Sequence, residues 1–353
     1  MGSRNKKMIP HSKPTLGARE ARAVVATVKS GFIAQGSKVR EFEKALARFV
    51  GVKDAVATNS GTTALHLGLL AMGIEKGDEV ILPSYVCTAP LNAVYYTGAT
   101  PVICDIDAGT FNILPESAAD KKTKAAAAVI VPHMFGAPAD IEEIEKAEVP
   151  VIEDCAHSIG ARYGKKMVGS MGRFSICSFY ANKMMACGEG GALLSNDQGI
   201  ISAARDMRDY DNREDYKVRY NYKMSDVLAA IGLVQLAALP SMIQKRKKLA
   251  ASYDKAFTGL GVGLPKGEFD HAYYRYVLRV KGTDIAALIA SLRANGVAAA
   301  HPVFKPLHRY LELRSSYRNT DEAYYTSLSL PIYPSLTQAE QKIVIKAVRE
   351  CLS

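Results

Sequence analysis

The sequence predicts an α/β protein whose mainly parallel sheet is covered by helices on both faces. Short apolar runs rich in β-branched residues alternate with segments of helical periodicity over most of the 353-residue chain. Strands buried on both faces have this continuous apolar character, and their alternation with helices is typical of parallel connections. The predicted strands cover residues 56–58, 79–82, 100–104, 128–131, 149–153, 175–179 and 191–194. The last two follow each other too closely for a helical crossover, so we expect them to pair antiparallel.

The last third of the chain predicts a smaller α+β unit. Helical periodicity dominates residues 225–257, on both sides of Pro240. Beyond it we expect a strand at 273–280, a helix at 284–295, a strand at 298–303 and a final helix at 338–351. This order predicts a large domain at 8–240 and a small C-terminal domain at 241–353.

The composition excludes several classes of protein. No run of 18 or more apolar residues occurs, so we expect a cytoplasmic protein without a membrane span. The six cysteines form no C-x-x-C pair, and no histidine lies near them at metal-ligand spacing, which predicts reduced thiols and no metal site. The net charge of +10 comes from basic residues scattered along the helices, without a nucleic-acid-binding module. We therefore expect no nucleic-acid partner, and an anionic substrate suits the basic field.

Residues 174–196 place one lysine where it is able to act chemically. Lys183 lies between two strand-like segments and just before a cluster of three glycines, Gly188, Gly190 and Gly191. Glycines permit tight turns and a close approach of the backbone to a ligand. A lysine held at such a turn is able to form a Schiff base with an aldehyde cofactor or a carbonyl substrate. The alternative is an ordinary solvated lysine, which most lysines are.

Residues 58–73 suggest a phosphate site at the start of a helix. Ser60, Gly61, Thr62 and Thr63 precede an apolar run with helical spacing. The first amides of a helix have no intrahelical acceptor and carry the positive end of the helix dipole, so they bind anions well. The alternative is an ordinary capped helix, because serine and threonine are favoured caps.

Residues 149–170 place a carboxylate at the end of a predicted strand. Ligands of open α/β sheets bind beyond the carboxyl ends of the strands, where Asp154 lies. A carboxylate there is able to keep a pyridine nitrogen protonated and make the ring an electron sink. The alternatives are a helix cap or surface carboxylate for Asp154 and a hydrogen-bonded structural histidine for His157.

Together these segments supply the three groups that pyridoxal 5′-phosphate (PLP) requires: a phosphate site, a carboxylate for the ring nitrogen and an amine for the aldehyde. The blocks EDCAHSIGA, SFYANKMMACGEGG and YNYKMSDVLAAIGLVQL carry a resemblance to a known family. The chain resembles the DegT/StrS family of PLP-dependent nucleotide-sugar aminotransferases over nearly its whole length. The block with His157 looks closest to the perosamine-type 4-aminotransferases. The resemblance implies PLP fold type I, which is aspartate aminotransferase-like.

The resemblance also implies roles for individual residues. Lys183 holds the cofactor aldehyde and moves the proton, and Asp154 pairs with the ring nitrogen. His157 lies near the ring and its hydroxyl. The phosphate is held at the helix start by Gly61, Thr62 and Thr63, by Ser178, and by Asn221 of the neighbouring subunit. Such sharing of sites predicts a homodimer.

Two positions depart from the family pattern. Cys87 stands where many members place an aromatic residue over the pyridine ring. A thiol is small and polarizable, so it is able to pack on the ring with less contact area, and Tyr85 is the alternative for that place. Lys223 stands where arginine is common, and the two are not equivalent at bidentate sites.

By resemblance, the expected reaction moves an amino group from L-glutamate to a keto group of a nucleotide-linked hexose, with the 4-keto position favoured. The product would be an amino sugar for polysaccharide or glycan biosynthesis. His301 and Lys305 are candidate substrate contacts, and surface residues are the alternative reading. Other possibilities are a cyclitol aminotransferase, a non-catalytic binding protein, or a sugar dehydratase of the same fold. In the dehydratases the lysine is replaced, typically by histidine.

Overall fold

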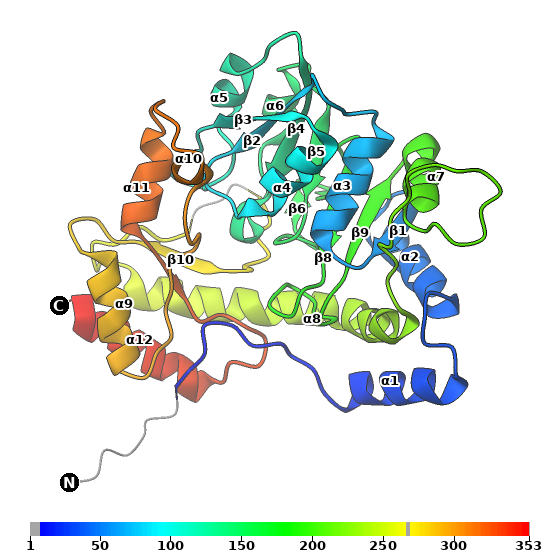
Figure 1. Cartoon of the computed structure of the whole chain (residues 1–353). Coiled ribbons are helices and arrows are strands. Elements are labelled where there is room, and N and C mark those ends of the chain that lie inside the picture. Colours follow the sequence, from blue (N-terminus) through cyan, green and yellow to red (C-terminus); the bar gives the residue numbers. More distant parts are fainter. Residues whose placement is uncertain (1–7, 266–268, 353) are drawn as a thin grey trace.

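The computed structural model describes residues 8–265 and 269–352 and has a seven-stranded sheet at its centre (Figure 1). The order of strands across the sheet is β1-β9-β8-β5-β4-β2-β3. All neighbours are parallel except β9, which is antiparallel to both β1 and β8. The strands are β1 (Asp54–Thr58), β2 (Glu79–Pro83), β3 (Thr100–Cys104), β4 (Ala126–Pro132), β5 (Val151–Asp154), β8 (Phe174–Ser178) and β9 (Gly191–Ser195). Each predicted strand of the large domain is confirmed, with bounds that shift by one or two residues, and so is the antiparallel pair.

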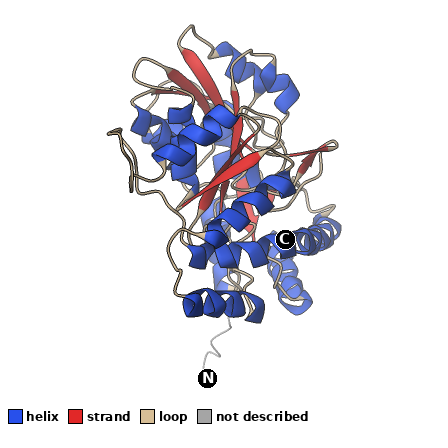
Figure 2. Cartoon of the chain, turned by 90° about the vertical axis from the view of Figure 1, so that its right-hand side faces the viewer, coloured by secondary structure: helices blue, strands red, loops and turns tan. Residues whose placement is uncertain are grey.

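Helices cover both faces of this sheet, as Figure 2 shows. One face packs on α3, α4 and α7 through a core that contains Val56, Ile152 and Phe174. The other packs on α2 and α8 near β1 and on α5 and α6 near β4. The helices of this part are α1 (Ala18–Ser30), α2 (Ser37–Val50), α3 (Gly61–Ala71), α4 (Thr88–Thr97), α5 (Pro115–Asp120), α6 (Ile141–Glu145) and α7 (Gln198–Met207), with a short 3-10 turn η1 (Met134–Gly136). A small hairpin, β6 (Arg162–Tyr163) and β7 (Lys166–Met167), follows β5.

The long helix α8 (Asp226–Phe257) connects the sheet region with the C-terminal part (Figure 1). It packs against α1 and α2 at one end and against α12 at the other. Pro240 lies inside α8, so this helix continues through the predicted boundary between the large and the small domain. The division into two domains at that residue stays a prediction. By length and composition alone, α8 is the one helix of the described residues that could cross a membrane. Half of that stretch is buried within the protein, so we describe α8 as a core helix.

The C-terminal part is built on a two-stranded antiparallel sheet, β10 (Tyr276–Arg279) and β11 (Ser327–Leu330). Its helices are α9 (Ile285–Ala294), α10 (Leu307–Tyr310), α11 (Arg318–Thr326) and α12 (Gln338–Leu352). The strand predicted at 298–303 is wrong, because only Ala300 forms an isolated bridge there, to Ser329. Pro302 interrupts that segment and cannot donate to a ladder, so the segment adds only this bridge to β11, which pairs with β10 along its length.

Candidate active site

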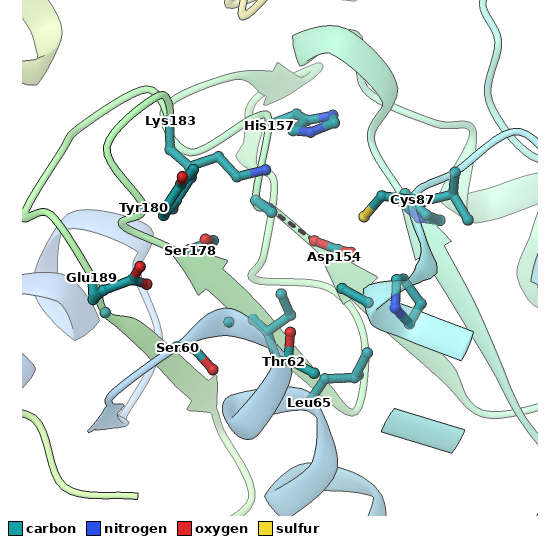
Figure 3. Close-up of a pocket in the computed structure, with 18 residues that line it drawn as sticks. Ser60, Thr62, Leu65, Cys87, Asp154, His157, Ser178, Tyr180, Lys183 and Glu189 are labelled. Atoms are coloured by element: carbon teal, nitrogen blue, oxygen red, sulfur yellow. Dashed lines mark hydrogen bonds between the residues drawn. The ribbon is translucent and has the colours of Figure 1, made fainter. Parts of the chain in front are cut away.

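A cavity of about 290 Å³ lies where β5 and β8 end and where α3 and α4 begin (Figure 3). Asp154 is the last residue of β5 and Ser178 the last of β8. The cavity therefore occupies the position beyond the strand ends where α/β sheets bind ligands. Its lining includes Ser60, Gly61, Thr62, Cys87, Asp154, His157, Ser178, Tyr180, Lys183, Glu189 and Gly190.

The start of α3 forms one end of the cavity. The Ser60 Oγ accepts from the Thr63 amide at 3.1 Å, and the Ser60 amide donates to the Thr63 hydroxyl at 3.2 Å. This capping box leaves the amides of Gly61 and Thr62 as helix-terminal donors. A Cβ on Gly61 would lie 2.9 Å from the Ser178 Cβ, so glycine allows α3 to start directly against the end of β8. Thr63, by contrast, does not line the cavity, because its hydroxyl is used by the cap.

Asp154 and Lys183 line the opposite end of the cavity. Asp154 is buried, and its carboxylate accepts a hydrogen bond from the Ala156 amide at 2.9 Å. Burial raises the pKa of Asp154, and the Ala156 bond and the charge of Lys183 oppose that shift only in part. Lys183 lies on the turn after β8, where its amide donates to the Tyr180 carbonyl at 2.9 Å. Its amine points into the cavity toward the side of Asp154 and His157 (Figure 3).

His157 lies in an aromatic stack at the edge of the cavity. Its ring packs on Tyr274 with centroids 4.2 Å apart, and on Phe135 at 6.2 Å. Burial lowers the pKa of His157 well below its ordinary value, and the charges of Lys183 and Arg275 lower it further. His157 is therefore neutral near pH 7 and offers a hydrogen bond rather than a charge.

Cys87 lies on the far side of the cavity from Lys183, at the residue before α4 (Figure 3). It is exposed and lines the cavity. Tyr85 does not reach the cavity: it is fully buried and stacks with Phe111 at 5.8 Å. Of the two candidates for the ring face, the structure brings only Cys87 to the site.

Tyr180 and Glu189 also line the cavity, and neither is among the site residues expected from the sequence. Glu189 lies between Gly188 and Gly190, whose φ values of 95° and 145° are accessible mainly to glycine. A Cβ on Gly190 would also meet the Met224 side chain at 3.1 Å. The two glycines on either side of Glu189 are the sequence feature from which its place in the site could have been predicted. Backbone conformations that require glycine often occur at binding and active sites.

Three further residues expected in the site, besides Thr63, lie outside the cavity. Asn221 is exposed, and its carbonyl accepts from the Asn59 side chain at 3.3 Å, beside the loop that leads into α3. His301 stacks on Tyr324 with centroids 5.2 Å apart. The Lys305 amine lies over the Tyr310 ring at 4.6 Å. Their roles stay predictions.

A buried group of possible metal ligands, His133, Glu153 and Cys155, lies behind Asp154. Hydrogen bonds occupy its atoms: His133 Nε2 pairs with Glu153 at 3.1 Å, and Nδ1 accepts from the Ala139 amide at 2.9 Å. Glu153 also accepts from three backbone amides of residues 169–172. We interpret the cluster as a brace for that loop and β5.

The cavity thus offers an anion cradle, a buried carboxylate and a primary amine, which is the set of groups that PLP requires. Asp154 is the strongest evidence that PLP fits this cavity. Burial disfavours the ionised form of this carboxylate, and a cationic ring nitrogen beside it would stabilise that form. The fold and the site together define a PLP-dependent enzyme of the aminotransferase type.

Comparisons with known proteins agree with that class. The profile of the DegT/DnrJ/EryC1/StrS aminotransferase family matches residues 14–349, and the chain belongs to this family. It is 36% identical to the spore coat polysaccharide biosynthesis protein SpsC of Bacillus subtilis (strain 168), over 97% of the chain and 96% of that protein.

Two solved structures are similar over almost their whole length. The aminotransferase TlmJ from Streptoalloteichus hindustanus has a TM-score of 0.94 and 30% identity, covering 98% of this chain and 99% of TlmJ. Helicobacter pylori PseC, an aminotransferase involved in pseudoaminic acid biosynthesis, has a TM-score of 0.91 and 25% identity, covering 98% and 99%. Other neighbours were solved in PLP and PMP forms. The protein is therefore a PLP-dependent sugar aminotransferase, and the family, fold and cofactor expected from the sequence are confirmed.

Proposed function

We propose that the protein transfers the amino group of L-glutamate to a keto carbon of a nucleotide-linked hexose, with the 4-keto position favoured. The product is an amino sugar for a polysaccharide or glycan, made in the cytoplasm. The observation that carries the proposal is the convergence of Lys183, Asp154 and the start of α3 in one cavity. The likeness to SpsC, a protein of polysaccharide biosynthesis, supports the sugar acceptor.

Each residue has a physical task in this reaction. When bound, PLP supplies an electron sink for the charge that develops at the substrate carbon. Asp154 holds a proton at the pyridine nitrogen, because an ionised buried carboxylate is stabilised by a cation next to it. The Lys183 amine takes the proton from the donor carbon and returns it to the acceptor carbon. Gly61, Thr62 and Ser178 hold the phosphate at the helix start.

A homodimer completes the proposal. Asn221 is exposed beside the phosphate end of the cavity, where it is free to reach a second subunit. Apolar side chains are also exposed on α1 and the turn after it: Val25 (51%), Val28 (55%), Phe32 (77%) and Ile33 (54%). A surface of this kind is typical of an interface that a second copy covers.

The first experiment tests the cofactor amine. PLP added to the purified protein should give a visible absorption band, and borohydride should fix the cofactor to Lys183, as peptide mass spectrometry would show. Lys183→Ala should lose both signals and all turnover. A wild-type protein that gives no adduct at Lys183 would contradict the proposal.

The second experiment tests donor and acceptor. A panel of 3-keto and 4-keto sugar nucleotides is incubated with glutamate, and both 2-oxoglutarate and the amino sugar are measured. Equal amounts of the two products with a 4-keto substrate support the proposal. A deoxygenated sugar in place of the amino sugar would support the dehydratase alternative, which intact Lys183 argues against.

A further inference from the structure

The sheet formed by β10 and β11 has two different faces. Side chains alternate along a strand, so residues on one face share a surface. The face with Tyr276, Leu278 and Leu328 packs into the small-domain core. On the other face, Val277 packs with the core of the large domain. Arg275 lies one residue before β10, and its amide donates to the Phe135 carbonyl at 3.2 Å. Arg275 is thus fixed between the two parts of the protein.

Arg275 has no acidic partner among the described residues. One of its terminal nitrogens lies 3.1 Å from His11 Nε2, which also bonds to the Ser329 hydroxyl at 2.8 Å. The Arg275 Nε is buried and has no hydrogen-bond partner within the described part of the chain. Burial and the Arg275 charge lower the pKa of His11 to about 3, so His11 is a neutral neighbour. A partly buried guanidinium without a carboxylate is unfavourable unless an anion binds to it.

Tyr274 connects this arginine to the reacting amine. The Arg275 Cζ lies 5.1 Å from the centre of the Tyr274 ring, and the Lys183 Nζ lies 5.3 Å from the same point. His157 stacks on that ring, and the Tyr274 hydroxyl donates to the Asn182 side chain at 3.3 Å. The ring is therefore held on several sides. Because both groups lie beside this ring, the guanidinium and the Lys183 amine are within about 10 Å of each other.

We propose that Arg275 is the carboxylate-binding residue for the amino donor and selects a dicarboxylic amino acid. The inference rests on the proposed function. The planar guanidinium fork matches a carboxylate with two parallel hydrogen bonds. Its separation from Lys183 suits the carboxylate at the far end of the donor better than the one next to the amine. The unpartnered Nε and the neutral His11 leave the charge of Arg275 available to that group.

Calorimetry with glutarate, a dicarboxylate that has no amine to react, tests the subsite without catalysis. The protein is loaded with PLP, and wild type is compared with Arg275→Gln and Arg279→Gln. Arg279 is a matched control on the same strand face, with its guanidinium bonded to the Ala108 carbonyl. We expect Arg275→Gln to weaken glutarate binding roughly 10- to 100-fold, as for loss of a charged hydrogen-bonded pair. Arg279→Gln should bind like wild type, and equal affinity in all three proteins would overturn the subsite.

A second variant guards against a folding defect. Arg275→Lys keeps the charge but loses the fork, so glutarate affinity should fall between those of wild type and Arg275→Gln. Titration with uridine diphosphate separates a phosphate site from a carboxylate site. Weaker binding of that nucleotide with unchanged glutarate binding in Arg275→Gln would overturn the assignment.

Single-turnover kinetics give the functional readout. Arg275→Gln should need roughly 10- to 100-fold more glutamate for its half-maximal rate, while L-alanine, which lacks the distal carboxylate, should react as with wild type. Equal slowing with both donors would overturn the proposal and leave a structural role. Absence of any wild-type adduct at Lys183 would reject the proposed function itself. A normal adduct with unchanged glutamate dependence in Arg275→Gln would reject the donor subsite alone.

Discussion

Asp154 combines its proposed catalytic task with a cost in stability. Its pKa is raised by burial, so the folded protein without cofactor disfavours the ionised form that prevails at neutral pH. The destabilisation is therefore absent below the ordinary pKa of 3.8, develops as the pH rises from that value to the raised pKa, and stays constant above it. A bound pyridinium ring removes it by placing a positive charge beside the carboxylate.

Asp154→Asn should therefore separate stability from activity. The variant carries a neutral side chain of the same shape, so the cofactor-free protein should melt roughly 1–3 °C higher than wild type at pH 7.5, and the gap should narrow on acidification and close below the ordinary carboxyl pKa of 3.8. Its kcat should fall by roughly 10²-fold or more, as for loss of one preorganised charge. Differential scanning calorimetry and the glutamate assay check both. Asp284→Asn, at the exposed cap of α9, should change neither, and a lower melting temperature in Asp154→Asn would refute the argument.

Cys87 differs from the other cysteines in its access to solvent. Four of them (Cys104, Cys155, Cys177 and Cys187) are buried, and burial raises the pKa of each, to about 12 for Cys187. The neutral, covered thiols should resist alkylation. Exposed Cys87 lines the cofactor cavity, so its reactivity reports on whether that cavity is filled.

Iodoacetamide labelling tests this placement. In cofactor-free protein Cys87 should label fastest, and PLP at ten times its dissociation constant should slow it about tenfold by occupying the cavity. Cys351, partly exposed on α12, is an internal control whose labelling should not respond. Mass spectrometry of the peptides measures both rates. If the labelling rate of Cys87 is the same with and without PLP, the thiol does not face the cofactor ring.

Local patterns revealed some of the site, and distant contacts supplied the rest. Lys183 and Asp154 could be predicted because each lies at a strand end within a short, characteristic motif. Tyr274 could not, because it comes from the C-terminal part and meets His157 only through the tertiary fold, and the same holds for Arg275 beside it. For Thr63 the motif predicted a phosphate contact, but its hydroxyl accepts from the Ser60 amide in the helix cap and does not line the cavity.

At the scale of elements, the strands were predictable wherever burial on both faces produced a continuous apolar run. The error at 298–303 has a specific cause, since an apolar run around Pro302 looks like a strand but cannot complete a ladder. Its neighbour β11, with alternating serine and leucine, is short and only half apolar, so its pairing with β10 depends on the small-domain core. Pairing between distant segments is a tertiary property and was not predictable from local sequence.

The start of α3 is the element on which the proposed phosphate binding depends, and Gly61 is its tightest position. In Gly61→Ala the new Cβ would lie 2.9 Å from the Ser178 Cβ, so the helix start and the end of β8 must separate. We expect PLP affinity to fall roughly 10- to 100-fold, because several charged hydrogen bonds lengthen together. Fluorescence titration of the apo-protein measures it.

Gly17→Ala is the matched control for that substitution. Gly17 also precedes a helix, α1, but a Cβ there meets only the Glu20 carboxylate at 3.9 Å. It should bind PLP like wild type. Unchanged affinity in Gly61→Ala would show that the phosphate is held elsewhere. Circular dichroism should be the same for all three proteins.

At the scale of the whole molecule, the proposed dimer accounts for the exposure of Asn221 beside the loop that leads into α3. Lys183 and the helix start come from one chain, whereas exposed Asn221 is expected to act on the other subunit. A site built from two subunits differs from a site within one chain in how inactive variants behave when they are mixed. Two different inactive variants should complement each other when their subunits exchange.

We expect Lys183→Ala and Asn221→Ala to be nearly inactive as separate homodimers. After mixing under conditions that permit subunit exchange, half of the dimers are hybrids, and each hybrid has one site with both native residues. Activity should therefore recover to about one quarter of the wild-type value, because of the twofold symmetry of the assembly. Mixing Lys183→Ala with Asp154→Asn is the control, since both residues belong to one chain's cavity and each hybrid then lacks an intact site. Failure of the first pair to recover, with exchange verified by native mass spectrometry, would place Asn221 outside the partner's site.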